Sequence, residues 1–196
     1  MHMIKRIRKK EIQITVLFIT VFAIMMIGLM VSIKYTENTK IGGVLYNEIM
    51  LSNSLTAEIM PPPMYTVESY SVALEYIGES NQDAMKKLVD DFKGMQVLYE
   101  GRYEYWKANL PQDEELRNEI LNYGYSTTEN FFEVFYNEVV PAVESGDESR
   151  ISVAKASLIN AYREHRTAVD EIVGLSVEWR QDVYDRAAQI TSVTRK

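Results

Sequence analysis

The feature of this sequence most able to create a polar site is a run of three prolines at residues 61–63. Proline has no backbone N–H and its ring clashes with the preceding helical turn, so three in a row must interrupt a helix. The carbonyl groups just before them, around Glu58, then lose their usual helical donors and must bind side chains, water or a ligand. We expect His165 or Arg166 to supply such donors.

A ligand pocket at the level of this proline break is the functional interpretation. Arginine and tyrosine side chains there would suit a small carboxylate or a similar polar ligand. The candidate ligand-binding residues are Pro61, Pro62, Pro63, Tyr65, Glu68, Tyr99, Arg102, Tyr103, Tyr123, His165 and Arg166. The alternative is a fixed kink whose polar groups are satisfied inside the protein, with His165 a hydrogen-bonded core residue. Glu68 can face either the interior or the solvent.

Catalytic chemistry has little support in the sequence. The chain has no Cys and only two His, His2 and His165, which excludes a thiol nucleophile, a disulfide framework and a Cys-ligated zinc site. It contains no Gly-rich phosphate loop, no H-E-x-x-H and no G-x-S-x-G motif. Paired acids such as Asp90 and Asp91 are adjacent, so they point to different helix faces. We therefore expect no enzyme, no catalytic residue, no metal site and no cofactor.

An uncharged apolar run at residues 12–33 predicts a transmembrane helix. Its 22 residues would reach roughly 33 Å, which is enough for a bilayer core of about 30 Å. A cleaved signal peptide is the alternative, but its apolar region is typically only about 7–15 residues, and no A-x-A-like cleavage site follows this run. We expect an uncleaved anchor in the lipid bilayer of the cell (inner) membrane.

The charge distribution orients this helix. Residues 1–11 hold five positive charges and one negative charge, although the whole chain carries a net charge of −7. The positive-inside rule keeps residues 1–11 in the cytoplasm as a basic tail and places residues 34–196 outside the cell as an extracytoplasmic domain. The acidic remainder excludes nucleic acid as a partner, because phosphates need a basic surface.

The outer region reads as helical. Apolar residues recur at steps of three and four in three stretches, as expected for packed helices. The first stripe is Leu88, Phe92, Met95, Tyr99, Tyr103 and Trp106; the second, less regular, is Leu116, Ile120, Tyr123, Phe131 and Val134; the third runs from Leu158 through Tyr162, Val169, Ile172, Trp179, Val183 and Ile190 to Val193. We expect these side chains to form the core.

Turn residues divide this region into four long elements. The first is expected to continue the membrane helix from Lys34 to Gly78 through the proline break, and the second to begin after an N-cap at residues 80–81. Pro111 and the acids after it start the third, which Gly124 with the Ser126-x-x-Glu129 box can divide. The turn marked by residues 141 and 146–147 precedes the last helix, which runs towards residue 195.

These elements predict an all-α fold, an N-terminal transmembrane helix continuing into an antiparallel up-down-up-down four-helix bundle. The last helix, about 48 residues or roughly 70 Å, is matched in length only by a first helix that includes the proline break. Facing helices advance by the same distance per residue from the membrane, so residues 61–63 should lie opposite His165 and Arg166. The middle helices contribute Tyr99, Arg102, Tyr103 and Tyr123 at this level.

Three segments resemble the sensor domains of bacterial methyl-accepting chemotaxis proteins. They are residues 41–49 (IGGVLYNEI), residues 55–70 (LTAEIMPPPMYTVESY) and residues 162–173 (YREHRTAVDEIV). The resemblance is most specific at the triple proline with its flanks. It implies sensing of an extracellular stimulus, brought by a small ligand or a periplasmic binding protein. The signal would be relayed across the membrane as a small helix displacement in a homodimer.

Such receptors continue into a second membrane helix, a HAMP linker and a cytoplasmic signalling hairpin, whereas this sequence stops at Lys196. We therefore expect either a fragment of a longer receptor or a free-standing sensor. The same outer region could instead serve a histidine kinase or a cyclic-dinucleotide enzyme. A membrane-anchored coiled-coil scaffold without a ligand is the alternative from a different class of protein.

Overall fold

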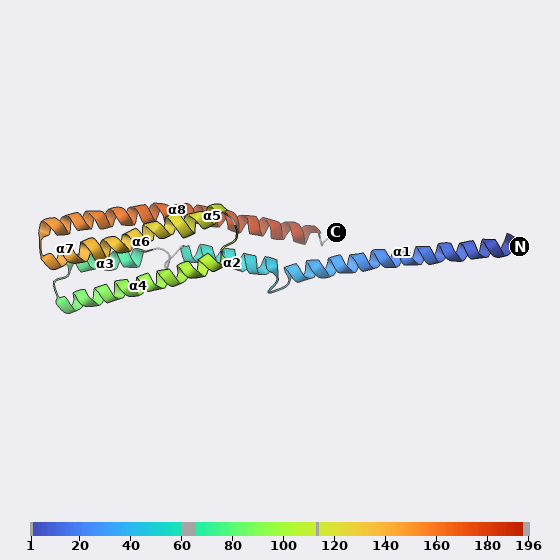
Figure 1. Ribbon diagram of the computed structural model, residues 1–196, viewed down its shortest axis with the longest axis horizontal. Coiled ribbons are helices and arrows are strands. Elements are labelled where there is room, and N and C mark those ends of the chain that lie inside the picture. The colour runs from blue at the N-terminus through green and yellow to red at the C-terminus, as the bar shows by residue number, and fades with distance from the viewer. Residues whose placement is uncertain (1, 60–65, 113, 194–196) are drawn as a thin grey trace. The chain divides into compact units, whose positions relative to one another are not determined.

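The computed structural model of the chain describes residues 2–59, 66–112 and 114–193, and all the regular elements in these ranges are helices (Figure 1). This confirms the all-α prediction. The chain divides into two compact units, residues 1–50 and residues 51–196.

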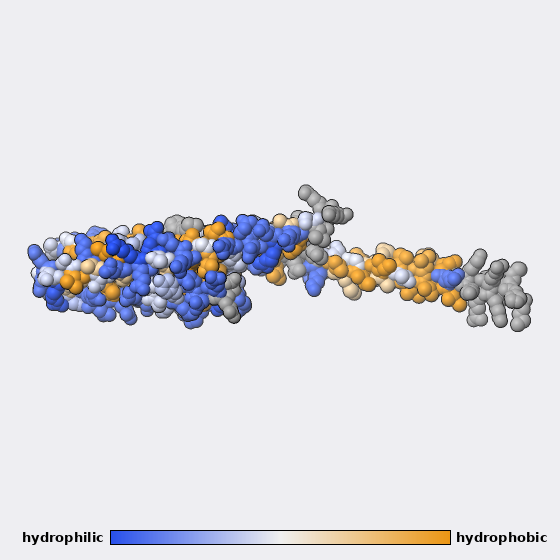
Figure 2. Space-filling view, turned by 90° about the horizontal axis from the view of Figure 1, so that it is seen from above, coloured by the Kyte–Doolittle hydropathy of each residue, from blue (hydrophilic) through white to orange (hydrophobic). Residues whose placement is uncertain are grey.

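The first unit is dominated by α1 (His2–Thr39). Its segment Ile12–Lys34, 23 residues long, buries none of its side chains against protein, and Figure 2 shows it as a continuous apolar surface. A helix that is apolar on all sides needs a surrounding apolar medium, because no polar face is left for water. By length and composition this helix can cross a membrane, as predicted.

The expected continuation of the membrane helix up to the prolines is wrong. The helix α1 ends at Thr39, a turn covers residues 40–43, and α2 (Val44–Ile59) begins after it. Gly42 adopts a left-handed φ of 81°, and the Gly43 N–H donates to the Lys40 carbonyl at 2.8 Å. The two adjacent glycines end the helix because glycine enters the left-handed region without steric cost.

In the second unit, α3 (Val67–Gly78) packs against α4 (Gln82–Asn109) and α8 (Glu148–Val193), and α6 (Tyr125–Val134) packs against α8. Figure 1 shows these helices lying alongside one another. Beyond the end of α2, the elements are α3 (Val67–Gly78), α4 (Gln82–Asn109), α5 (Glu114–Asn118), η1 (Glu119–Gly124), α6 (Tyr125–Val134), η2 (Phe135–Val139), α7 (Val140–Ser145) and α8 (Glu148–Val193).

The predicted starts of the second and last long helices are confirmed by their caps. The Asn81 side-chain oxygen accepts hydrogen bonds from the N–H groups of Asp83 and Ala84, at 3.0 and 3.1 Å. The Asp147 carboxylate likewise accepts from Ser149 N–H at 2.9 Å, after Gly146 has turned the chain with a φ of 66°. Each cap supplies acceptors for N–H groups that the first helical turn leaves without partners.

Gly124 does not divide the third element, and the third predicted turn lies at Gly146 without including Pro141, which is inside a helix. Gly124 has right-handed helical angles, and the Ser126 hydroxyl donates to the Tyr123 carbonyl instead of capping a new helix. Two π-helical turns, η1 and η2, keep the chain helical, and η2 directly precedes the short helix that contains Pro141. A π turn displaces the preceding carbonyls, which relieves the clash that proline makes inside a helix.

Aromatic side chains from α3, α4, α6 and η2 form the aromatic core, defined here as Tyr76, Phe92, Phe131, Phe132 and Phe135. All five are buried, and the rings of Phe92 and Phe135 stack with centroids 3.8 Å apart. This confirms the first predicted stripe, in which Phe92, Tyr99 and Trp106 are buried. The second stripe is wrong at Tyr123, which is exposed; this residue lies inside the π turn η1, where the wider turn departs from α-helical spacing.

Candidate functional site

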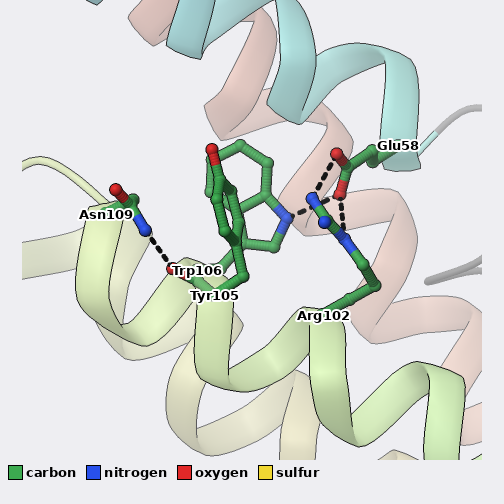
Figure 3. Close-up of polar contacts among 5 residues, drawn as sticks. All are labelled: Glu58, Arg102, Tyr105, Trp106 and Asn109. Carbon is green, nitrogen blue, oxygen red and sulfur yellow. Dashed lines mark hydrogen bonds and ion pairs between the residues drawn. The ribbon is translucent and has the colours of Figure 1, made fainter.

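A carboxylate from one helix is held by an arginine and a tryptophan from another, directly before the proline run (Figure 3). Glu58 lies on the last turn of α2, and Arg102 and Trp106 lie one turn apart on α4. Arg102 Nε donates to Glu58 Oε2 at 2.8 Å, while Arg102 Nη2 donates to Oε1. Trp106 Nε1 donates to Oε2 at 2.9 Å. With Tyr105, these residues are called the Glu58 cluster below.

The Glu58 cluster is buried on the side that faces the protein and accessible to solvent on the other side. Trp106 is fully buried, whereas the side chains of Arg102 and Glu58 remain 31% and 24% exposed. The Arg102 guanidinium also lies over the Tyr105 ring, 4.4 Å from its centroid. The fork of the guanidinium matches both carboxylate oxygens, which makes this a specific and directional pair. Solvent nevertheless reaches it, so other anions can approach Arg102.

His165 is buried beside a small cavity next to this region. Its Nδ1 lies 3.0 Å from the oxygen of the Thr128 hydroxyl, whose proton is donated to the Gly124 carbonyl at 2.7 Å. The cavity is about 10 Å³ and is lined by Ile59, Tyr99, Ile120, Gly124, His165, Val169 and Ile172. That volume holds one water molecule at most. In this arrangement His165 is a hydrogen-bonded core residue at the level of the end of α2.

Glycine at position 124 allows the helix that carries it to lie close to α8. A Cβ atom there would come within 2.7 Å of Ile172 Cδ1 and 3.1 Å of the Glu119 carbonyl oxygen. A larger residue there would have to displace the end of the Ile172 side chain next to the cavity. Burial raises the pKa of the neighbouring Tyr99 hydroxyl, although a hydrogen bond with Thr128 partly opposes this.

Only some of the predicted ligand-binding residues lie close to one another in the structure. Tyr99 and His165 line the same small cavity, while Arg102 binds Glu58. Tyr103 is half-buried, and its ring stacks on Tyr125 with centroids 4.0 Å apart. Pro61, Pro62, Pro63 and Tyr65 lie outside the described residues.

The remaining predicted residues lie at the surface. Glu68, on the first turn of α3, faces solvent, which settles the ambiguity about its direction. Tyr123 is exposed, and Arg166 is exposed with its Nε 3.5 Å from Asp170 on the same helix. These positions place them away from the buried cavity beside His165.

Sequence reasoning missed the Glu58 side chain, Trp106 and Thr128 as members of this site. The available signal was the four-residue spacing of Arg102 and Trp106, which places both on one helix face, together with an acid just before a helix break. That spacing does not identify Glu58 as the partner of Arg102 and Trp106, because the two contacts join residues 44 and 48 positions apart in the chain.

A carboxylate pair was also missed. Burial raises the pKa of the Glu119 carboxyl, and a hydrogen bond and the negative charge of Glu171 on α8 raise it further, with a smaller contribution from Glu115. In the part of the chain that the structure describes, no group of three or more His, Asp or Glu residues is arranged to hold a metal ion.

Comparison with known proteins gave no match, whether to a family model, to a curated protein or to a solved structure.

Proposed function

We propose that this chain is the sensory module of a transmembrane chemotaxis receptor of the methyl-accepting type. In this proposal α1 anchors it in the cell membrane with residues 1–11 in the cytoplasm. Residues 34–196 lie outside the cell as an antiparallel up-down-up-down four-helix bundle that works as a homodimer. The exposed apolar surface of Ile12–Lys34 and the side-by-side packing of α3, α4, α6 and α8 support this proposal, as does the resemblance at residues 55–70.

The observation that carries the proposal is the Glu58 cluster. A carboxylate of the chain itself occupies Arg102 in the two-pronged geometry that a small carboxylate ligand would use. Solvent reaches this pair, so a ligand carboxylate can compete with Glu58 for the guanidinium. When the ligand binds, Glu58 is released, and the end of α2 loses its polar attachment to α4.

The free energy of the contact between Glu58 and Arg102 is small, but it is sufficient to bias the position of α2. A hydrogen bond to a charged group contributes roughly 1.5–3 kcal/mol, and partial exposure of Arg102 and Glu58 reduces this through solvent screening. Coupling energies in allosteric proteins are typically about 1–3 kcal/mol. Exchange of one carboxylate for another is therefore enough to bias the position of α2, provided that the ligand binds the released arrangement better.

Ligand-dependent thermal stabilisation of the full chain in lipid nanodiscs tests the proposal. The panel contains amino acids, dicarboxylates and aromatic acids, each paired with its uncharged amide. At a ligand concentration of 100 times Kd the stabilisation is about 2.7 kcal/mol, which moves Tm by several degrees. We expect a shift with at least one acid and none with its amide.

Two variants give opposite results if Arg102 is the binding group. Arg102→Gln removes the cation and should abolish the ligand-dependent shift. Glu58→Gln keeps the shape of the competitor but removes its charge, so carboxylate affinity should rise by roughly tenfold, about 1.4 kcal/mol. A panel without any shift, or the same response in both variants, would overturn the proposal.

A ligand-free scaffold is the second candidate, and one observation favours it. The interior beside His165 is packed, with a cavity of only about 10 Å³. A scaffold predicts no acid-dependent shift in the same panel, in either variant or in the unmodified chain.

A further inference from the structure

A cleft lies at the end of the second unit where α3 leads into α4 and α7 leads into α8 (Figure 1). We call it the end cleft. Its volume is about 220 Å³, and α3, α4 and α7 contribute to its lining Tyr76, Met85, Lys86, Val89, Val140 and Glu144. A water molecule occupies about 30 Å³ in the liquid, so the end cleft has room for a ligand of roughly seven or eight non-hydrogen atoms.

The floor of the end cleft is mostly apolar. Tyr76 and Met85 are only 2% and 6% exposed, and Val89 and Val140 are half-buried. The Tyr76 hydroxyl adds a polar group, and within the described residues it has no hydrogen-bond partner. A hydroxyl on a buried side chain costs free energy unless water or a ligand satisfies it. Because Tyr76 lines the end cleft, a bound ligand can reach this hydroxyl.

Two opposite charges border the end cleft. Lys86 on α4 and Glu144 on α7 are exposed, and neither forms an ion pair with any residue that the structure describes. Lys87, the next residue, pairs instead with Asp91 on its own helix. Burial raises the pKa of the Tyr76 phenol, and the negative charge of Glu144 raises it further, so this carboxylate lies close to the hydroxyl. An ammonium and a carboxylate that border one cleft can each bind a ligand group of opposite charge.

The positions of the two valines indicate what lies beneath those charges. Val89 is one helical turn after Lys86, and Val140 is one turn before Glu144. Because α4 runs away from this end of the unit and α7 runs towards it, both valines lie deeper than the two charges. A ligand that contacts both charges therefore places its carbon atoms over an apolar floor.

We propose that the end cleft binds a small aliphatic zwitterion. Its carboxylate contacts the Lys86 ammonium, its ammonium contacts the Glu144 carboxylate and the Tyr76 hydroxyl oxygen, and its carbon atoms pack on the two valines. Each charged group then gains a partner of opposite sign, and the carbon atoms leave water for an apolar surface. Among the described residues no ion pair joins α4 to α7, so such a ligand would link these two helices.

The end cleft is separate from the Glu58 cluster, and binding there does not depend on the proposed function. Lys86 precedes Arg102 by 16 residues, which is roughly 24 Å along α4. The two sites share no residue. A zwitterion also differs from the simple carboxylate expected at Arg102, because it needs a cation and an anion at once.

Isothermal titration calorimetry of the full chain in lipid nanodiscs tests this site. The probes are 5-aminopentanoate and valine, isomers that differ in the distance between their two charges. We expect at least one of them to bind with a Kd below about 1 mM. Pentanoate and pentylamine should bind at least about tenfold more weakly, because each makes only one of the two charge contacts. No binding of either isomer, or equal binding of the singly charged probes, would overturn the proposal.

Exchange of the two charges across the end cleft supplies the second arm. Lys86→Glu and Glu144→Lys should each weaken binding at least about tenfold. The double variant restores one charge of each sign, so its affinity should return to within about threefold of the unmodified chain. Lys87→Glu is the matched control, and it should change Kd by less than about threefold, because salt screens an exposed charge outside the cleft. Single variants that bind normally, or a folded double variant that does not bind, would contradict the proposal.

The variant Arg102→Gln separates this site from the Glu58 cluster. Binding of the zwitterion should persist in this variant. Loss of binding would place the zwitterion at Arg102 and overturn the assignment to the end cleft. A chain whose end cleft binds nothing still gives the acid-dependent thermal shift if Arg102 binds carboxylates, so either result can fail alone.

Discussion

The aromatic core and the Glu58 cluster use the same side of α4 in different ways. At Phe92 the helix contributes a ring that stacks on Phe135, and the surrounding contacts are apolar. Two heptads further on, Trp106 buries its ring equally well but uses its N–H to hold Glu58. Apolar contacts depend on shape and area, so they have no exchangeable partner. The Glu58 cluster depends on a carboxylate that another carboxylate can replace.

The molecule should be rigid at the aromatic core and able to rearrange at the Glu58 cluster. Helices joined by close-packed rings resist displacement, since any gap forfeits contact energy. The end of α2 is joined to α4 by a directional pair next to solvent. Substitutions in the aromatic core and in the Glu58 cluster should therefore change the free energy of unfolding by different amounts. They should also differ in how far salt and ligands alter that change.

The largest effect is expected from Phe92→Ala in the aromatic core. Removing this fully buried ring should lower the free energy of unfolding by about 3–5 kcal/mol, because it leaves a cavity among four other aromatic side chains. Trp106→Phe tests the hydrogen bond of the Glu58 cluster alone, and it should cost only about 1 kcal/mol, since most apolar area is kept and one hydrogen bond is lost. Denaturant unfolding of the full chain measures both. Equal losses would show that the two regions do not differ as proposed.

A smaller effect is expected at Thr128, which joins His165 to the Gly124 carbonyl. Thr128→Val keeps the shape but leaves buried polar groups without this hydroxyl, which should cost about 1–3 kcal/mol. Thr167→Val is the control, because its hydroxyl donates to a backbone carbonyl on the exposed side of α8. The control should change stability by less than about 0.5 kcal/mol. Thermal unfolding of the two variants side by side checks the difference.

The ion pair between Glu58 and Arg102 is expected to contribute about 1 kcal/mol, a value limited by its partial exposure. A double-mutant cycle with Glu58→Gln and Arg102→Gln isolates this coupling from the other contacts of each residue. The coupling should shrink as salt rises from low to high ionic strength, whereas the effect of Phe92→Ala should not. A coupling near zero at low salt would remove the energetic basis of the proposed switch.

The smallest effect is expected from pH and depends on Glu119. Its pKa is raised in the folded protein, so the folded state holds a proton that the unfolded chain releases. Stability is therefore greater below the unfolded pKa and falls as pH rises through the raised folded pKa. Glu119→Gln should flatten this pH dependence and change stability by less than about 0.5 kcal/mol, because the group is only half-buried. Glu164→Gln, an exposed change on α8, should leave the slope as it is.

Local signals in the sequence predicted several elements correctly. The apolar run from residue 12, the cap at Asn81 and the turn at Gly146 each depend on residues within a few positions of one another. The stripe through Phe92, Tyr99 and Trp106 was also found, because burial of one helix face produces a regular spacing. The break at Gly42 was missed, although two adjacent glycines were its local signal.

The π turns explain why the third long element was harder to predict. Each inserts a wider turn that shifts the apolar stripe, and Tyr123, which lies inside the first of them, is at the surface. Whether a glycine or a proline breaks a helix depends on what packs around it, as Gly124 and Pro141 show. No sequence window contains that information.

The amino-acid sequence by itself determined that the chain is helical, where its apolar helix lies and which face of α4 is buried. These follow from local periodicity and capping, which act over one or two turns. Only the tertiary structure decided that Glu58 binds Arg102 and Trp106, and that Thr128 meets His165. Those contacts join residues 37 to 48 positions apart, and their pairing depends on how the helices align when the core packs.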